Sequence, residues 1–222
     1  EYLDGYLIPV NSRYLPEDAR TAELINDSRN DFPELAEVIA KIEQPLMRRY
    51  NRESSIGNLL TDFMKSAGNS DIGFLNSGAI RADMNAGNLT LEQLINVYPF
   101  KDNLTVIELS GKQVRDLIEY SLTLPYGIGQ VSGLSITYDS SKNTLERIVD
   151  VKVNGETIID AKKYTVAVSG YLADGGDGFI VFTEGKVVNA DQPFQDALYG
   201  QFKKISHIKK PAINRQVDIS KQ

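Results

Sequence analysis

The sequence contains no cysteine and a single histidine, His207. The absence of cysteine excludes disulfide bonds, thiolate catalysis and zinc sites built from cysteine. One imidazole, in the lysine-rich stretch KKISHIKKP, cannot supply the several histidines of a two-metal hydrolytic site. With a single histidine, a Ser–His nucleophile arrangement is not expected either. We therefore expect His207 to be a solvated surface residue.

Long apolar runs and basic stretches are also absent. No hydrophobic run approaches the roughly 20 residues that a membrane-spanning helix needs. The net charge is −6 and the pI is about 4.9, so a nucleic-acid backbone is not an expected partner. An acidic protein can still bind a phosphate locally through a few arginines. The sequence thus predicts neither a membrane span nor a nucleic-acid surface.

The length of the chain bounds its organisation. Its 222 residues are enough for one domain, or for one domain with a linker. Hydrophobic residues make up 41% and charged residues 24%, which is ordinary for a globular protein. Because the chain begins with Glu1 and not with Met, we expect it to be processed, trimmed or excised from a longer protein.

The first fifty residues combine two patterns. Residues 1–16 alternate apolar and polar side chains and end at a proline, which predicts a strand followed by a connector. Residues 17–50 are expected to be rich in helix, and Pro45 could kink or end that helix. Apolar side chains recur there at helical spacing: Phe32, Leu35, Val38, Ile39, Ile42 and Leu46. The predicted helix is either an interdomain spacer or the first core helix.

From residue 51 onward, start and stop signals are clearer. Ser54 or Ser55 can cap a helix that Gly68-Asn69 ends, and Gly87-Asn88 predicts a tight turn. Thr90 and Gln93 form a capping box, and Asn154-Gly155 predicts a hairpin. The predicted helices are 56–68, 91–97, 111–122 and 191–205. The predicted strands are 71–76, 103–110, 133–139, 164–172 and 214–219, and 147–159 holds the two strands of the hairpin. This mixture predicts an α+β fold with mixed or antiparallel sheets packed against helices.

Four segments place polar or aromatic residues beside turns or glycines: 51–58, 76–81, 98–100 and 171–179. Loops of this kind let the backbone approach a ligand closely. They supply the groups that bind a nucleoside phosphate, namely aromatic rings, an amide, a carboxylate and guanidinium groups. The candidate binding residues are Arg52, Asn76, Arg81, Phe100, Tyr171 and Asp177.

Each candidate also has a structural interpretation. Arg52 and Arg81 could pair with surface carboxylates, and Phe100 and Tyr171 could be core residues. Asp177, between glycines, could merely stabilise a turn. The stretch GGDGF lacks the Lys and Ser/Thr of a P-loop and the spaced carboxylates of an EF-hand, so neither of these sites is predicted.

A family resemblance rests on four segments in order: NRESSIGNLLTDFM, FLNSGAIRADMNAGNLTLEQLINVYPFKDNLTVIELSGKQV, QVSGLSITYD and SGYLADGGDGF. Together they resemble the C-terminal domain of the 5'-nucleotidase family over about residues 50–216. The opening GYLIPVNSRYLPEDA resembles the end of the family's catalytic domain and the start of its linker. The resemblance implies that residues 1–49 are the end of the catalytic domain with linker strand and helices, and that 50–222 is the substrate-binding domain.

The resemblance implies that Phe100 and Tyr171 sandwich a nucleoside base, with Asn76 hydrogen-bonded to that base. The family often has phenylalanine where this chain has Tyr171. Tyrosine keeps the stacking and adds a hydroxyl, so Tyr171→Phe is expected to be nearly neutral.

The resemblance also implies which part of the ligand each charged candidate contacts. Arg52 and Arg81 would contact ribose and phosphate, and Asp177 would accept hydrogen bonds from the ribose hydroxyls. The preferred ligand stays open among 5'-mononucleotides, nucleotide sugars and cyclic nucleotides, because base stacking tolerates every base.

The family's metal motifs have no counterpart here. We therefore expect no catalytic residue, metal site or cofactor in this chain, and expect the divalent metal pair in an N-terminal metallophosphatase domain or a separate metallophosphatase chain. Alone, the chain should bind nucleosides or nucleotides without hydrolysing them. By resemblance it is expected to be periplasmic, on the cell surface or extracellular. The alternatives are a stand-alone nucleoside-binding module or exported surface protein, and a structural domain with a vestigial pocket.

Overall fold

The computed structural model describes residues 5, 8, 10, 14–125 and 127–221. The chain divides into two compact units, Glu1–Glu37 and Val38–Gln222. In the first unit, helix α1 (Ala19–Asn30) begins where the Asp18 carboxylate accepts a hydrogen bond from the amide of Thr21, and none of its residues is buried. A short 3-10 turn, η1 (Pro33–Ala36), follows it. The strand predicted over residues 1–16 falls mostly outside the described residues.

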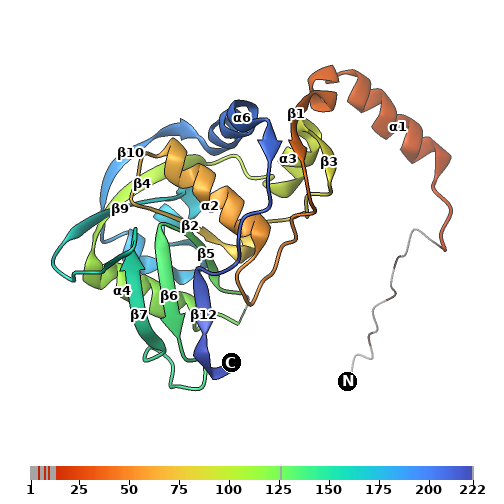
Figure 1. Ribbon diagram of the computed structural model, residues 1–222. Coiled ribbons are helices and arrows are strands. Elements are labelled where there is room, and N and C mark those ends of the chain that lie inside the picture. Colours follow the sequence, from red (N-terminus) through yellow and green to blue (C-terminus); the bar gives the residue numbers. More distant parts are fainter. Residues whose placement is uncertain (1–4, 6–7, 9, 11–13, 126, 222) are drawn as a thin grey trace. The chain divides into compact units, whose positions relative to one another are not determined.

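The second unit is organised around a five-stranded sheet (Figure 1). Its strands, in spatial order, are β10 (Lys186–Pro193), β4 (Asn103–Ser110), β9 (Lys163–Ser169), β2 (Ile72–Asn76) and β5 (Gly129–Ser132). Only β2 and β9 pair in parallel within this sheet. Alternate residues of a strand point to opposite faces, so this sheet contributes side chains to two separate cores.

Two smaller sheets flank the five-stranded one. One has the order β11 (His207–Ile208), β1 (Val38–Ile42), β3 (Gly87–Thr90). The other has the order β12 (Gln216–Asp218), β6 (Leu134–Tyr138), β7 (Ile148–Val153), β8 (Glu156–Thr157). The β7–β8 hairpin turns at Asn154-Gly155, both with positive φ, as the sequence predicts. The predicted α+β class is confirmed.

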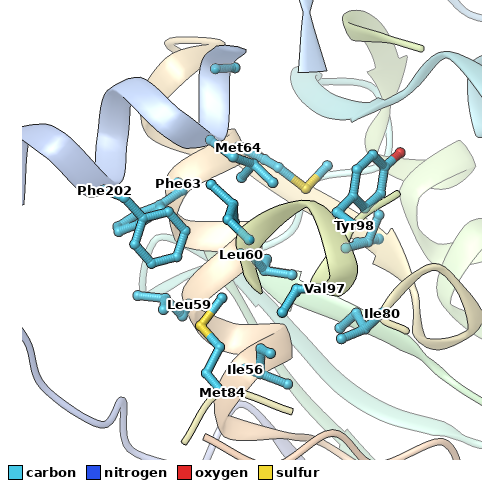
Figure 2. Packing of buried hydrophobic residues seen from close by; sticks show 14 of the residues in the cluster. Ile56, Leu59, Leu60, Phe63, Met64, Ile80, Met84, Val97, Tyr98 and Phe202 are labelled. Carbon is cyan, nitrogen blue, oxygen red and sulfur yellow. The ribbon is translucent and has the colours of Figure 1, made fainter. Parts of the chain in front are cut away.

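The first core lies between the sheet and helices α2 (Ser55–Ala67), α3 (Leu91–Val97) and α6 (Phe194–Ile205). Figure 2 shows side chains of α2, among them Ile56 and Leu60, packed with Val97 and Tyr98. Helix α2 begins at the predicted cap, where Ser54 accepts a hydrogen bond from the amide of Gly57. It packs so closely on β2 that a Cβ at Gly73 would lie 2.2 Å from the Thr61 carbonyl oxygen.

The second core lies on the opposite face, under α4 (Gly111–Ser121) and the sheet that contains β6 and β7. Both α3 and α4 begin with complete capping boxes, and that of α3 is the predicted pair Thr90 and Gln93. Among the described residues, no helix combines the length and apolar character needed to cross a membrane.

The helix predicted around residues 32–46 is wrong. After η1, residues Val38–Ile42 form strand β1, which pairs with β3 on one side and β11 on the other. Its burial does not alternate strictly, since the neighbours Ile39 and Ala40 are both buried, and its pairing with β3 shifts register between Val38 and Ala40. The spacing of apolar residues over so short a stretch does not distinguish a helix from a strand. Residues 38–42 are a strand because they pair with two distant strands.

Other element boundaries differ from prediction for similar reasons. Gly87, predicted in a tight turn, has φ +113° and opens β3 opposite Ile42. The strand predicted to run through residue 172 ends at Ser169, whose hydroxyl caps the short helix α5 (Gly170–Ala173). Helix α6 begins three residues later than predicted because Asp191–Pro193 belong to β10, an edge strand that the sequence did not predict.

Candidate functional site

A cavity of about 590 Å³ opens at one end of the strands of the five-stranded sheet. Parallel strands β2 and β9 both end there, and β4, antiparallel to β9, begins there with Leu104 opposite Ser169. Segments far apart in sequence therefore meet at these strand ends. The lining residues are Asn76, Gly78, Ala79, Arg81, Tyr98, Phe100, Lys101, Asp102, Ser169, Tyr171 and Asp177.

Two aromatic side chains on the lining are accessible. Phe100, between α3 and β4, is 37% exposed, and Tyr171, in α5, is 52% exposed. Behind Phe100 lies Tyr98, which is 1% exposed and meets the Phe100 ring edge-on at 5.4 Å between centroids. Tyr98 in turn stacks on Phe194 at 4.1 Å. The core thus supports the Phe100 ring through Tyr98. Both Phe100 and Tyr171 keep exposed surface that a ligand can cover.

Tyr98 and Asp102 line the cavity but are not among the candidate binding residues, although Tyr98 lies in the segment 98–100 that the sequence indicates. The Tyr98 hydroxyl lies 2.9 and 3.1 Å from the two Asp102 carboxylate oxygens. Burial raises the pKa of Tyr98 well above its ordinary range, and the charge of Asp102 raises it further. Asp102 Oδ2 also accepts a hydrogen bond from the amide of Tyr171 at 3.3 Å. This carboxylate therefore links the two aromatic segments, and its position two residues after Phe100 was the only signal for it.

Asp177 lies on a tight turn, η3 (Gly176–Gly178), with φ 53° and ψ 18°. Its Oδ1 accepts from the Tyr171 hydroxyl at 2.7 Å, and its Oδ2 accepts from Asn76 Nδ2 at 2.6 Å. The bond to Asp177 raises the pKa of the Tyr171 hydroxyl. Asn76 is only 8% exposed, and its Oδ1 has no hydrogen-bond partner among the described residues. Three predicted site residues are thus joined directly.

Arg81 is one of the two described basic residues that line the cavity, the other being Lys101. Its guanidinium carbon lies 5.3 Å from the centre of the Phe100 ring. The backbone is anchored, because Arg81 N–H donates to Val97 and the Arg81 carbonyl accepts from Arg48 at 2.6 Å. The Arg81 side chain forms no hydrogen bond or ion pair with any residue that the structure describes. The structural interpretation of Arg81 as a partner of a surface carboxylate is therefore not supported.

Arg52 is the one predicted site residue that does not line the cavity. It is exposed on the loop before α2, and its carbonyl accepts from Gln130 Nε2 at 3.1 Å. The same Gln130 nitrogen donates to Ser77 Oγ at 2.8 Å. Because Ser77 follows Asn76, a buried amide connects the Arg52 loop to the cavity without bringing the guanidinium to its wall.

In the part of the chain that the structure describes, potential metal ligands do not form a cluster. There, no group of three or more His, Asp or Glu side chains is arranged to hold a metal ion. His207 is exposed at the start of β11, as predicted. The chemistry that the cavity offers is therefore stacking, hydrogen bonding to carboxylates and contact with a cation.

Comparison with known proteins agrees with this architecture. The family described as 5'-nucleotidase, C-terminal domain, matches residues 38–184. An apyrase of Tabanus yao is 29% identical over 212 residues, covering 83% of this chain and 37% of the apyrase. A trifunctional nucleotide phosphoesterase of Bacillus subtilis is 34% identical over 146 residues, covering 60% of this chain and 10% of that protein.

A solved structure of a 5'-nucleotidase precursor from Thermus thermophilus superposes with a TM-score of 0.81 at 28% identity. The match covers 91% of this chain and 44% of that structure, so this chain spans less than half of these relatives. The family match extends over more than half of the chain and includes every residue that lines the cavity. The chain therefore belongs to the 5'-nucleotidase family and contains its C-terminal domain.

Proposed function

We propose that this chain is the nucleoside- or nucleotide-binding part of a 5'-nucleotidase-type phosphoesterase. One observation carries the proposal: all predicted binding residues except Arg52 line a single cavity, although they come from segments spread over residues 76–177. At about 590 Å³ the cavity is within the usual range for small-molecule sites. Family membership points to the same class of ligand.

The roles follow from the chemistry of each wall. A planar base would stack between Phe100 and Tyr171, whose rings are the accessible apolar surfaces. Asp177 would accept from ribose hydroxyls, and the unpaired guanidinium of Arg81 would contact the phosphate. Asn76 would contact the base through its amide oxygen, because its amide nitrogen already donates a hydrogen bond to Asp177.

Hydrolysis of the phosphate ester is proposed to need a second component. The expected divalent metal pair would belong to a metallophosphatase domain, in the same protein or in a separate chain. The relatives that this chain matches are more than twice the length of the matched part, which leaves room for such a domain. We expect this chain alone not to release phosphate from AMP, with or without added divalent metal.

Family membership also supports a place outside the cytoplasm, in the periplasm or at the cell surface. Fractionation of the native cells with an antibody against this chain would test that proposal. Recovery only in the cytoplasmic fraction would contradict it.

Calorimetry with adenosine, AMP and inorganic phosphate tests the binding function. We expect saturable binding of adenosine and AMP, and weaker binding of phosphate alone. Phe100→Ala should weaken adenosine binding by roughly 1–3 kcal/mol, the usual contribution of a base stacked on an aromatic ring. Absence of binding by the folded parent protein would reject the proposal and favour a vestigial pocket.

A second assay separates the enzyme part from a stand-alone binding module. The coding sequence upstream of this segment should contain metal motifs, and the extended protein should hydrolyse AMP. Binding without hydrolysis in the extended, metal-loaded protein would favour the stand-alone module.

A further inference from the structure

Tyr171 and Asp177 form a closed pair of hydrogen bonds. The Tyr171 hydroxyl donates to Asp177 Oδ1 at 2.7 Å, and the Asp177 amide donates back to the same hydroxyl oxygen at 3.0 Å. Asp177 has φ 53°, in the left-handed region that residues other than glycine seldom adopt. Such a conformation persists where neighbouring groups determine it. The Tyr171 hydroxyl binds both the backbone and the carboxylate of the strained residue.

The Tyr171 ring has a support of its own. A Cβ at Gly176 would lie 2.5 Å from ring atoms, so the ring packs directly on the backbone of Gly176. Removal of the hydroxyl alone should therefore leave the ring in place as a stacking surface. The hydroxyl and the ring can be separated by the substitution Tyr171→Phe.

The carboxylate of Asp177 has unused capacity on both oxygens. Each carboxylate oxygen can accept about two hydrogen bonds. Tyr171 occupies one position on Oδ1 and Asn76 occupies one on Oδ2, and no other described residue bonds to either oxygen. One acceptor position per oxygen remains, which suits two adjacent hydroxyl groups.

We propose that the Tyr171 hydroxyl is a positioning group that orients the Asp177 carboxylate toward a vicinal diol, and so makes the site selective for ribonucleosides with both ribose hydroxyls. This inference rests on the proposed function and adds to it. A preoriented carboxylate loses less conformational freedom when the ligand binds. The effect differs from the near-neutral outcome that the sequence predicts for Tyr171→Phe, because the sequence showed no partner for the hydroxyl.

The test is calorimetry of the parent, Tyr171→Phe, Asp177→Ala and the double variant, each with adenosine and 2',3'-dideoxyadenosine. Tyr171→Phe should weaken adenosine binding by about 3- to 10-fold, the size of one hydrogen bond, and leave dideoxyadenosine binding unchanged. In the Asp177→Ala background, Tyr171→Phe should have no further effect, since the group it positions is absent.

Tyr120→Phe is the matched control. The Tyr120 hydroxyl donates to the backbone carbonyl of Asp177 at 2.9 Å, so this variant loosens the same turn without touching the carboxylate. Adenosine binding should survive Tyr120→Phe. An equal loss in both hydroxyl variants, or an unchanged affinity in Tyr171→Phe, would overturn the inference. If the parent binds no adenosine, the proposed function and this inference both fail. If the parent binds adenosine and Tyr171→Phe binds it with the same affinity, only the inference is rejected.

Discussion

At the residue scale, the charges at the cavity are held in different ways. The carboxylates of Asp102 and Asp177 are hydrogen-bonded to neighbouring side chains, which fixes their orientation. Arg81 is fixed through its backbone, and its guanidinium has no carboxylate partner among the described residues. A cation of this kind is available to an anionic ligand without first losing an ion pair.

The first prediction follows from this difference. Arg81→Ala should weaken AMP binding by about tenfold or more, the effect of losing a charge-assisted hydrogen bond, and should weaken adenosine binding much less. Added salt should reduce the gap between the two ligands. Arg81→Lys should restore only part of the affinity, because an ammonium group lacks the planar fork of arginine.

Arg52→Ala is the comparison, measured by the same calorimetry. Because Arg52 does not line the cavity, its loss should affect AMP binding less than the loss of Arg81. Equal effects of the two substitutions on AMP, or no effect of either, would contradict this ordering.

At the scale of elements, a buried amide joins the loops around the site. Gln130, in β5, is 0% exposed. Its Oε1 accepts from the Ser54 amide and hydroxyl, and its Nε2 donates to Arg52 and Ser77. One side chain therefore connects the start of α2 with the turn after β2. The positions of the two loops depend on each other through this contact.

The second prediction concerns this junction. Gln130→Met preserves the volume and removes both hydrogen-bonding ends, which leaves buried polar partners unmatched. We expect the free energy of unfolding to fall by about 1–3 kcal/mol, and AMP affinity to fall as well. Denaturant titration and calorimetry measure the two effects. In the control Gln216→Met, one side-chain bond to the Gly129 carbonyl is lost while the bonds of Gln130 to Arg52 and Ser77 stay, so its AMP affinity should fall less than that of Gln130→Met.

A second element-scale feature is the end of β12, where Asp218 accepts hydrogen bonds from the Ser140 amide at 3.1 Å and the Ser220 hydroxyl at 2.7 Å. Lys221 Nζ lies 3.1 Å from its other oxygen. Burial would raise the pKa of Asp218, but these partners outweigh burial and hold the pKa below its ordinary value of 3.8. The ionised carboxylate therefore stabilises the folded state.

The third prediction is a pH dependence. Because the pKa is lower in the folded state, the stabilisation is present above pH 3.8 and is lost progressively as the pH falls below that value. Asp218→Asn keeps the shape and removes the charge. Its melting temperature should be lower than that of the parent at pH 7, and the difference should shrink between pH 4 and pH 2.5. A difference that stays constant with pH would show that the charge makes no contribution.

At the scale of the whole molecule, the core and the cavity belong to one unit. Both buried clusters and every residue that lines the cavity lie within Val38–Gln222. Helix α1, in the other unit, has no buried residue. We therefore expect the second unit to fold and to form the site without the first.

The fourth prediction is that a chain starting at Val38 folds cooperatively and binds adenosine with the affinity of the full chain. Thermal unfolding and calorimetry of the two proteins, side by side, measure this. A large loss of melting temperature, or of affinity, in the shorter chain would mean that residues before Val38 support the site.

Features that depend on local hydrogen bonds and on the order of motifs could be predicted from the amino-acid sequence. The caps at Ser54 and Thr90 and the hairpin at Asn154-Gly155 could be predicted because each satisfies backbone groups within a few residues. The α+β class followed from the mixture of predicted helices and strands, and the family from four motifs in their order. Five of the six candidate binding residues line one cavity, and their binding roles stay predictions.

Features that depend on distant partners could not be predicted in this way. Strand β1 has a spacing that also suits a helix, and it is a strand because β3 and β11 hydrogen-bond to it. The bond of Asp177 to Asn76, and the absence of Arg52 from the cavity wall, follow from how β2, β9 and the loops meet. Hydrogen bonds between residues about 100 positions apart leave no periodic trace in a sequence, so they become visible only when the chain is folded.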